Sequence, residues 1–286
     1  MELECVITAA GMGTRARPWS VLLPKALLPL AIRLDGGVQL KPVADIIMGN
    51  LAKAGCGRVI VVKRPDDNVL PTYLKLMWSM LDLAFVNQDE PKGFGDAAYR
   101  GLLNVKGDLA IIHADDGFIT DPGYIVGGVR AVKEYGYDIV LFARHVSDAR
   151  RYGVVMDHSP LINIGGLPSV EVYSIEEKPK RPKTSLALAA VYVVKVGKVN
   201  AALGKLTGSG GYVELTDALQ LAIDSGAKAL AIIIGSDEWV SVGTPDDYVK
   251  AQLRLYAESL SQAQSGQVEA LRKLIEVGLG QAQTQP

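Results

Sequence analysis

Apolar runs of strand length alternate along this chain with segments whose apolar residues have helical spacing. The predicted buried strands are residues 3–7, 59–62, 109–113, 138–143, 187–195 and 229–234, with a further strand near residue 85. The predicted helices between them are residues 42–54, 70–80 and 124–135 and one that begins near Asp96. This alternation predicts an α/β fold with a mostly parallel central sheet and helices on both faces.

The pattern changes after about residue 145. Residues 152–155 and 170–175 read as strands around a Gly-Pro loop, and residues 246–262 and 268–277 read as helices before a polar tail. An Asp-Gly-Gly run at residues 35–37 is typical of a hairpin turn. We expect one α/β domain over residues 1–245, with C-terminal helices and a tail, residues 246–286, packed on it.

Composition narrows the classes of protein. The 286 residues are 49% hydrophobic, and 30 basic residues balance 31 acidic ones, which gives no reason to expect a nucleic-acid partner. No apolar run approaches the roughly 18 residues of a membrane helix, and the acidic residues 1–4 do not resemble a secretory signal. We expect a cytoplasmic protein that does not bind membranes. Cys5 and Cys56 are expected to be buried thiols rather than a disulfide.

The stretch most suggestive of chemistry follows the first strand. Gly11 and Gly13 let the backbone turn tightly and bring N–H groups to an anion, and Arg15, Arg17 and Lys25 supply cations. A Gly-x-Gly pair alone is often a mere turn, and this one also fits the dinucleotide pattern G-x-G-x-x-A. That pattern must open a helix, which Pro18 and Pro24 oppose. A loop with three cations favours a nucleoside triphosphate.

Two further polar groups follow predicted strands. Gln88 and Gly93 lie where a strand enters a Gly-rich loop, and Asp115 and Asp116 follow the apolar run 109–113. Each has an ordinary explanation: a polar residue at a strand end, or an Asp-rich turn. Carboxylates at the carboxyl end of a central strand nevertheless lie where open α/β sheets bind ligands.

Together these motifs resemble the sugar-1-phosphate nucleotidyltransferases, especially the glucose-1-phosphate uridylyl- and thymidylyltransferases. The segment Gly-Met-Gly-Thr-Arg at 11–15 and the segment Pro-Lys-Ala-Leu-Leu-Pro at 24–29 carry the resemblance. It implies a Rossmann-like domain that joins a sugar 1-phosphate to a nucleoside triphosphate with Mg²⁺, with a nucleotide half at about 1–145 and a sugar half at about 146–245. The resemblance assigns catalysis to Arg15, Lys25 and Asp115, and nucleotide binding to Ala10, Gly11, Gly13, Thr14, Gln88, Gly93 and Asp116.

Gln88 would pair with the imide edge of uracil or thymine, so the expected nucleotide is UTP or dTTP. The resemblance implies glucose 1-phosphate as the sugar phosphate. Asp115 would take the Mg²⁺. In the sugar half, Glu-Lys-Pro at 177–179 matches the family, with Lys178 on the sugar phosphate and Glu177 on a sugar hydroxyl. Gly153 and Tyr192 complete the expected sugar-phosphate site.

The sugar half also departs from the family pattern. Ala190 and Tyr212 stand where a glycine and a glutamate are usual, and Ser241 replaces the aspartate that supplies a second metal ligand. Glu214 is the expected substitute for the glutamate. Asp237 and Glu238 are the candidates to replace the aspartate, and Asp237 is preferred because it shares a strand face with Trp239 and Ser241 in the strand expected there. These departures keep open an alternative function, a non-catalytic relative that binds nucleotides or nucleotide sugars. Homo-oligomers, dimers or tetramers, are expected from the resemblance alone.

Overall fold

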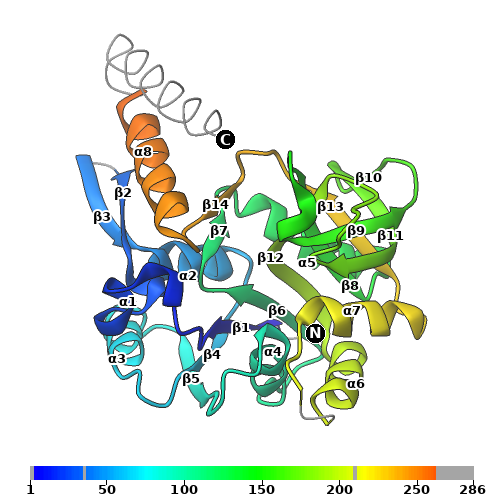
Figure 1. Cartoon of the computed structure of the whole chain (residues 1–286), viewed down its shortest axis with the longest axis horizontal. Coiled ribbons are helices and arrows are strands. Elements are labelled where there is room, and N and C mark those ends of the chain that lie inside the picture. Colours follow the sequence, from blue (N-terminus) through cyan, green and yellow to red (C-terminus); the bar gives the residue numbers. More distant parts are fainter. Residues whose placement is uncertain (1–2, 35–36, 209–210, 262–286) are drawn as a thin grey trace.

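A computed structural model describes residues 3–34, 37–208 and 211–261. Within these residues ten strands form one sheet in the order β10-β11-β13-β8-β12-β6-β1-β4-β5, and β9 pairs with β11 and β12 (Figure 1). The strands of this sheet are β1 (Leu3–Ala9), β4 (Arg58–Lys63), β5 (Asp82–Asn87), β6 (Leu109–Ala114), β8 (Ile139–His145), β9 (Gly153–His158), β10 (Ile162–Ile164), β11 (Leu167–Glu177), β12 (Leu186–Lys195) and β13 (Ala229–Ile233).

The sheet is mixed rather than mostly parallel. β5, β4, β1 and β6 form a parallel core, and β13 is parallel to β8. β12 runs antiparallel to both β6 and β8, and β9, β10 and β11 pair antiparallel with their neighbours. The prediction of a mostly parallel sheet is therefore right for its core and for β13 beside β8, and wrong for β9 to β12. Short connections such as the one from β10 to β11 can join only antiparallel strands.

Helices cover both faces of the sheet, as predicted. Alternate residues of β1 divide between two hydrophobic clusters: Cys5 and Ile7 belong to one, and Val6 belongs to the other. The first cluster includes residues of α2 (Val43–Lys53), α3 (Val69–Met77), α5 (Gly123–Tyr135) and α8 (Pro245–Ser261). The second includes residues of α4 (Phe94–Leu102), α6 (Val196–Thr207) and α7 (Leu215–Asp224). Among the described residues no helix has the length and apolar character needed to cross a membrane.

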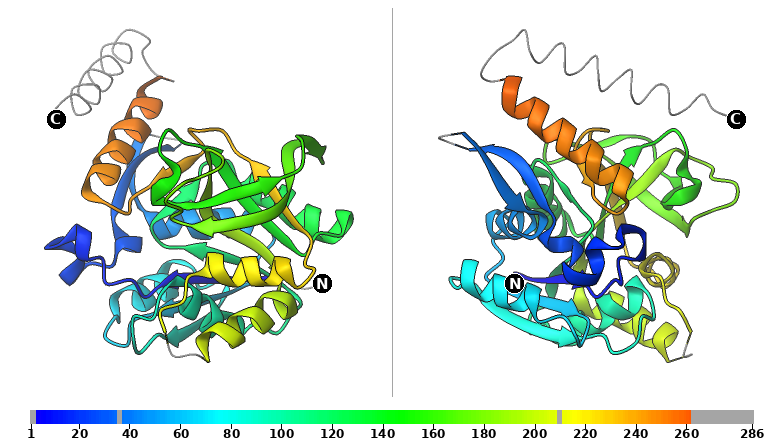
Figure 2. Two further views of the ribbon diagram at one scale, coloured as in Figure 1. Left: turned by 45° about the vertical axis from the view of Figure 1, so that its right-hand side comes forward. Right: turned by 60° about the vertical axis from the view of Figure 1, so that its left-hand side comes forward.

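Two small sheets stand outside the main one. β2 (Pro29–Leu34) and β3 (Gly37–Pro42) form the expected hairpin, although its turn at 35–36 lies outside the described residues. α8 packs beside this hairpin (Figure 2), and Tyr248 Oη donates a hydrogen bond to Pro29 O. β7 (Gly117–Ile119) pairs with β14 (Trp239–Ser241). The second predicted C-terminal helix, 268–277, also lies outside the described residues.

The expectation of two free thiols is wrong. Cys5 and Cys56 form a disulfide between Cα atoms 6.3 Å apart, and both residues are buried. The cause is strand pairing: β1 and β4 are parallel neighbours, Cys5 lies opposite Val59, and Cys56 comes just before β4. The disulfide fastens the first strand to the segment that leads into its neighbour.

Candidate active site

The loop after β1 keeps its shape through a contact that only glycine allows. Gly13 has a φ of 59°, and a Cβ there would lie 2.7 Å from Ser20 Cβ. Ser20 Oγ donates a hydrogen bond of 2.7 Å to Gly13 O, which holds the loop against the next turn. The chain then makes three short helical turns: η1 (Thr14–Ala16), α1 (Trp19–Leu22) and η2 (Lys25–Leu27). No long helix opens at this loop, so the pattern of a dinucleotide site is not fulfilled.

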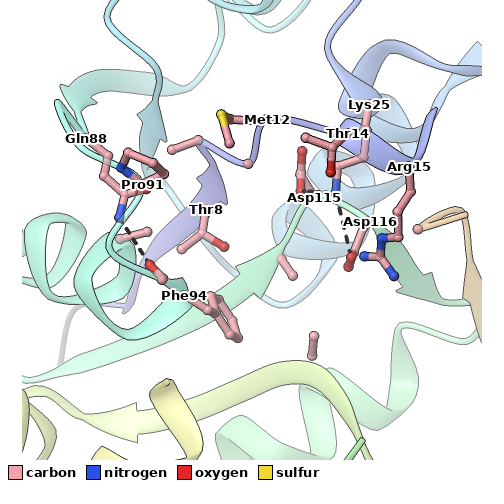
Figure 3. Close-up of a pocket in the computed structure, with 18 of the residues that line it drawn as sticks. Thr8, Met12, Thr14, Arg15, Lys25, Gln88, Pro91, Phe94, Asp115 and Asp116 are labelled. Carbon is pink, nitrogen blue, oxygen red and sulfur yellow. Dashed lines mark hydrogen bonds and ion pairs between the residues drawn. The ribbon is translucent and has the colours of Figure 1, made fainter. Parts of the chain in front are cut away.

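This loop borders a cavity of about 510 Å³. At one end lie Gln88 and Pro91; at the other, Arg15, Lys25, Asp115 and Asp116 gather (Figure 3). Its lining comes from β1 and the glycine loop, η2, the segment between β5 and α4, α4, the end of β6, the residue after β11, β12, and the segments before α7 and α8. The lining residues are Thr8, Ala10, Gly11, Met12, Gly13, Thr14, Arg15, Lys25, Gln88, Pro91, Gly93, Phe94, Ala97, Ala114, Asp115, Asp116, Lys178, Ala190, Tyr212, Glu214 and Gly243. The cavity is large enough for a small organic ligand.

Lys25 dominates the charged end of the cavity. Its Nζ lies 3.3 Å from Asp115 Oδ1 and 3.7 Å from Asp116 Oδ2. Burial alone would lower the pKa of Lys25, but the two carboxylates outweigh burial and raise this pKa above the usual lysine value. Burial raises the pKa of Asp115, and Lys25 opposes that shift without reversing it. One ammonium thus faces two carboxylates at the carboxyl end of β6.

At the other end, Gln88 is held by its amide nitrogen. Nε2 donates to Gly93 O (3.1 Å) and to Asp96 Oδ2 (2.7 Å), so both N–H groups are engaged. Within the described residues Oε1 has no hydrogen-bond partner. Gly93 has a φ of 100°, and a Cβ there would lie 2.4 Å from Val213 O. The loop therefore holds Gln88 Oε1 in place as an acceptor, and its backbone at Gly93 packs closely against Val213.

Lys178 forms the side of the cavity nearest the antiparallel strands. Its Nζ lies 2.7 Å from Glu177 Oε1 and 3.3 Å from Glu214 Oε1. Burial would lower the pKa of Lys178, but the hydrogen bonds and charges of these two carboxylates raise it, so Lys178 is a cation. Its φ of 46° is a backbone conformation that non-glycine residues rarely adopt. Such geometry is frequent at functional sites.

The cavity brings together most of the residues selected from the sequence. Twelve of those residues line it: Ala10, Gly11, Gly13, Thr14, Arg15, Lys25, Gln88, Gly93, Asp115, Asp116, Lys178 and Glu214. Glu177, Gly153 and Tyr192 lie behind the lining. A Cβ on Gly153 would be 3.0 Å from Glu177 Oε2, and the buried ring of Tyr192 lies 6.1 Å from that of Phe94.

Asp237 does not reach the cavity. The sequence places it on one strand face with Trp239 and Ser241, but β14 begins only at Trp239, and Asp237 lies exposed in the preceding turn. The alternation of strand faces therefore does not extend to residue 237. Asp237 is not among the residues that line the cavity, so its expected role as a metal ligand finds no support in this arrangement of the chain.

Several lining residues were not predicted from the sequence. Met12, Pro91 and Phe94 are flanked by predicted site residues, so their position in a motif was the available signal. Gly243 lies two residues after Ser241, which the sequence singled out, whereas Thr8 carried no such signal. His113 on β6 is fully buried, its Nδ1 lies 2.6 Å from Ala114 O, and its Nε2 has no partner within the described residues. Burial lowers the pKa of His113 to about 4, so this imidazole is neutral.

Comparison with known proteins identifies the family. A family model described as Nucleotidyl transferase matches residues 4–258. The chain belongs to this family. Nucleotidyl transferase relatives include a glucose-1-phosphate thymidylyltransferase of Mycolicibacterium smegmatis, 26% identical over 86% of this chain and 80% of the relative. A UTP–glucose-1-phosphate uridylyltransferase of Haloferax volcanii is 25% identical over 90% of this chain and 98% of the relative.

The nucleotidyl transferase fold is also found in solved structures. A UDP-glucose pyrophosphorylase complexed with UDP-glucose superposes with a TM-score of 0.76 over 90% of this chain and 100% of that chain, at 20% sequence identity. A glucose-1-phosphate thymidylyltransferase from Bacillus anthracis, described as putative, gives 0.73 over 88% and 95%, at 19% identity. At these identities the likeness shows the fold alone.

Nucleotidyl transferases are typically metal-dependent, and the acidic end of the cavity suits a hard divalent cation. Its donors are carboxylate oxygens, which Mg²⁺ prefers, and they already converge on the ammonium of Lys25. The described residues contain no group of three or more His, Cys, Asp or Glu that could hold a metal. Two carboxylates without a full protein cage fit an ion that arrives with substrate phosphates.

Proposed function

We propose that this nucleotidyl transferase joins a nucleoside triphosphate to a sugar 1-phosphate, giving a nucleotide sugar and pyrophosphate. The observation that carries the proposal is the common cavity of the glycine loop, Lys25 and the Asp115–Asp116 pair. Backbone N–H groups, an ammonium and carboxylates for a divalent cation are the groups that a triphosphate requires. The named relatives, which act on glucose 1-phosphate, support the sugar-phosphate half of the reaction.

The nucleotide half, residues 1–145 in this proposal, selects a pyrimidine base. Both N–H groups of the Gln88 amide are engaged, so Oε1 is the atom that accepts the imide N–H of uracil or thymine. Adenine presents an acceptor, N1, at the corresponding edge and cannot donate to Oε1 there. We propose UTP or dTTP as the nucleotide for this reason, with the glycine loop and Arg15 on its phosphates.

In the mechanism, an oxygen of the sugar phosphate attacks the α-phosphorus in line, and the bond to the β-phosphate oxygen breaks to release pyrophosphate. Arg15 and Lys25 stabilise the charge that develops on the phosphates. Lys178, held between Glu177 and Glu214, positions the sugar phosphate within residues 146–245. Mg²⁺ held by Asp115 would neutralise phosphate charge. No protein nucleophile is required, because the phosphate itself attacks.

The direct test is pyrophosphate release. The purified protein is incubated with Mg²⁺, each of UTP, dTTP, ATP and GTP, and a panel of sugar 1-phosphates that includes glucose 1-phosphate. We expect release with a pyrimidine triphosphate and one or a few sugars, and none when the sugar phosphate is omitted. Release with purine triphosphates only would overturn the base assignment.

Ser241 favours a second candidate function. On β14, beside the segment that contains Asp116, this residue carries a neutral hydroxyl instead of a carboxylate. A relative that binds nucleotide without turnover would lack a metal-binding carboxylate in this way. Such a protein would bind UTP or UDP-glucose in calorimetry and release no pyrophosphate with any sugar phosphate. The two measurements together distinguish an enzyme from a binding protein.

A further inference from the structure

Asp115 and Asp116 line the same cavity but differ in how far their side chains are exposed to solvent. The Asp115 side chain is 8% exposed and lies under Lys25, whereas that of Asp116 is 31% exposed. Both carboxylates reach the same ammonium, at 3.3 and 3.7 Å. Lys25 therefore marks a place where oxygens from two successive residues converge on one cation.

The pairing of β7 with β14 brings Asp116 beside Ser241. Ser241 lies opposite Gly117, and Val242 N donates a hydrogen bond of 2.8 Å to Asp116 O. Ser241 Oγ accepts a hydrogen bond of 3.2 Å from Gly243 N, so the hydroxyl is engaged by its own loop. A neutral, engaged hydroxyl is a poor ligand for a hard dication.

Gly243 shows how closely these groups approach. A Cβ built on Gly243 would lie 3.3 Å from Asp116 Oδ2 and 3.5 Å from Ser241 Oγ. The Asp116 carboxylate and the Ser241 hydroxyl thus flank one point on the cavity wall. Because residue 243 has no side chain, that point is open to the cavity, and the carboxylate can face a ligand there.

We propose that Asp116 provides the second carboxylate for the divalent cation that binds with the nucleoside triphosphate, in the role that an aspartate at position 241 could otherwise fill. The proposal rests on the proposed function, since the triphosphate supplies the remaining ligands. The second carboxylate then lies at the same end of the cavity as an aspartate at position 241 would, but it follows β6 instead of belonging to β14. A serine at position 241 is then compatible with activity, because Asp116 supplies the carboxylate.

The test measures metal binding without turnover. Mn²⁺ is titrated into protein with UTP and no sugar phosphate, free Mn²⁺ is followed by electron paramagnetic resonance, and the Mn²⁺ that UTP binds by itself is measured without protein and subtracted. We expect Asp116→Asn to weaken Mn²⁺ binding by roughly tenfold or more, the scale seen when groups that support a metal site are removed. Asp116→Asn combined with Ser241→Asp restores most of the affinity. Asp237→Asn, a matched change in the exposed turn, leaves it unchanged.

The double variant makes the test decisive. Rescue by Ser241→Asp shows that Asp116→Asn is folded and that the lost property is a carboxylate at this place. Wild-type affinity in Asp116→Asn, or a loss that Ser241→Asp does not repair, overturns the inference. If wild-type protein releases pyrophosphate while Asp116→Asn binds Mn²⁺ normally, only this inference fails. A wild type that neither holds Mn²⁺ with UTP nor releases pyrophosphate overturns the proposed function as well.

Discussion

Lys25 connects the glycine loop to the acidic end of the cavity. If it stabilises charge on the phosphates, Lys25→Ala should lower kcat by about 10²- to 10³-fold, the effect of removing one electrostatic stabiliser. Lys133→Ala, an exposed lysine on α5, is the control and should leave kcat unchanged. Steady-state pyrophosphate release measures both variants, and circular dichroism checks that they fold. A Lys25→Ala enzyme with wild-type kcat would contradict the role.

Gln88 should determine the choice of base. Replacing Gln88 with alanine removes the Oε1 acceptor, so the preference for UTP or dTTP over ATP should shrink by about 1 to 3 kcal/mol, the cost of leaving a buried polar group unpaired. Isothermal titration calorimetry with each triphosphate gives the difference directly. Gln39→Ala, on the exposed surface of the hairpin, should leave the preference intact. Equal affinities for purine and pyrimidine triphosphates in the wild type would refute the assignment.

Sequence motifs located most of the residues that line the cavity, because the groups expected to bind phosphate lie close together along the chain. Gly11, Gly13, Arg15 and Lys25 are selected from the glycine loop and its cations together with the family resemblance, and all four line one cavity. The contact of Asp116 with the segment around Ser241 could not be predicted in this way. It depends on a three-residue pairing of β7 with β14, across more than a hundred residues of chain.

At the scale of elements, the segment before α7 connects Lys178 with the base loop, residues 88–95, which carries Gln88. Val213 N donates to Lys92 O and Gly95 N donates to Val213 O, while Glu214 contacts Lys178. The alternation of strands and helices predicted the flanking elements. It could not predict this contact, because irregular segments pair through single hydrogen bonds that leave no periodic pattern in the sequence.

Gly93→Ala tests that junction. The new Cβ would meet Val213 O at 2.4 Å in a backbone conformation that alanine rarely adopts, so both the base loop and the segment before α7 must move. We expect the Kd values for UTP and for glucose 1-phosphate both to rise, measured by calorimetry. Gly57→Ala, where a Cβ would meet nothing within 4 Å, is the matched control. If only UTP binding weakens, the segment does not link the two sites.

At the scale of the whole molecule, Glu4 ties the first strand to two other parts of the fold. It is buried, pairs with Arg58 and accepts hydrogen bonds from the backbone N–H groups of Lys106 and Gly107. Burial alone would raise the pKa of Glu4, but the bonds to Arg58 and to those N–H groups lower it. A carboxyl whose pKa is lower in the folded state stabilises the fold above its unfolded pKa and loses that contribution as the pH falls through the folded value.

Glu4→Gln should therefore lower the free energy of unfolding at pH 7 by about 1.5 to 3 kcal/mol, the usual range for hydrogen bonds to charged groups. Below about pH 4.3, the pKa of glutamate in an unfolded chain, the difference from wild type should narrow as the pH falls, because the unfolded chain then binds a proton that folded Glu4 takes up only at its lower pKa. Urea denaturation at the two pH values measures this. A difference that does not change with pH would show that packing, not charge, is responsible.

The turn that holds the glycine loop also gives the protein a spectroscopic reporter. Ser20, which bonds to Gly13, follows Trp19, whose side chain is 62% exposed, while Trp78 and Trp239 are partly buried. Iodide in solution should therefore quench Trp19 fluorescence preferentially. A triphosphate bound to the loop would change the accessibility of Trp19 and so the quenching constant, which allows ligand binding to be followed in the unlabelled wild-type chain.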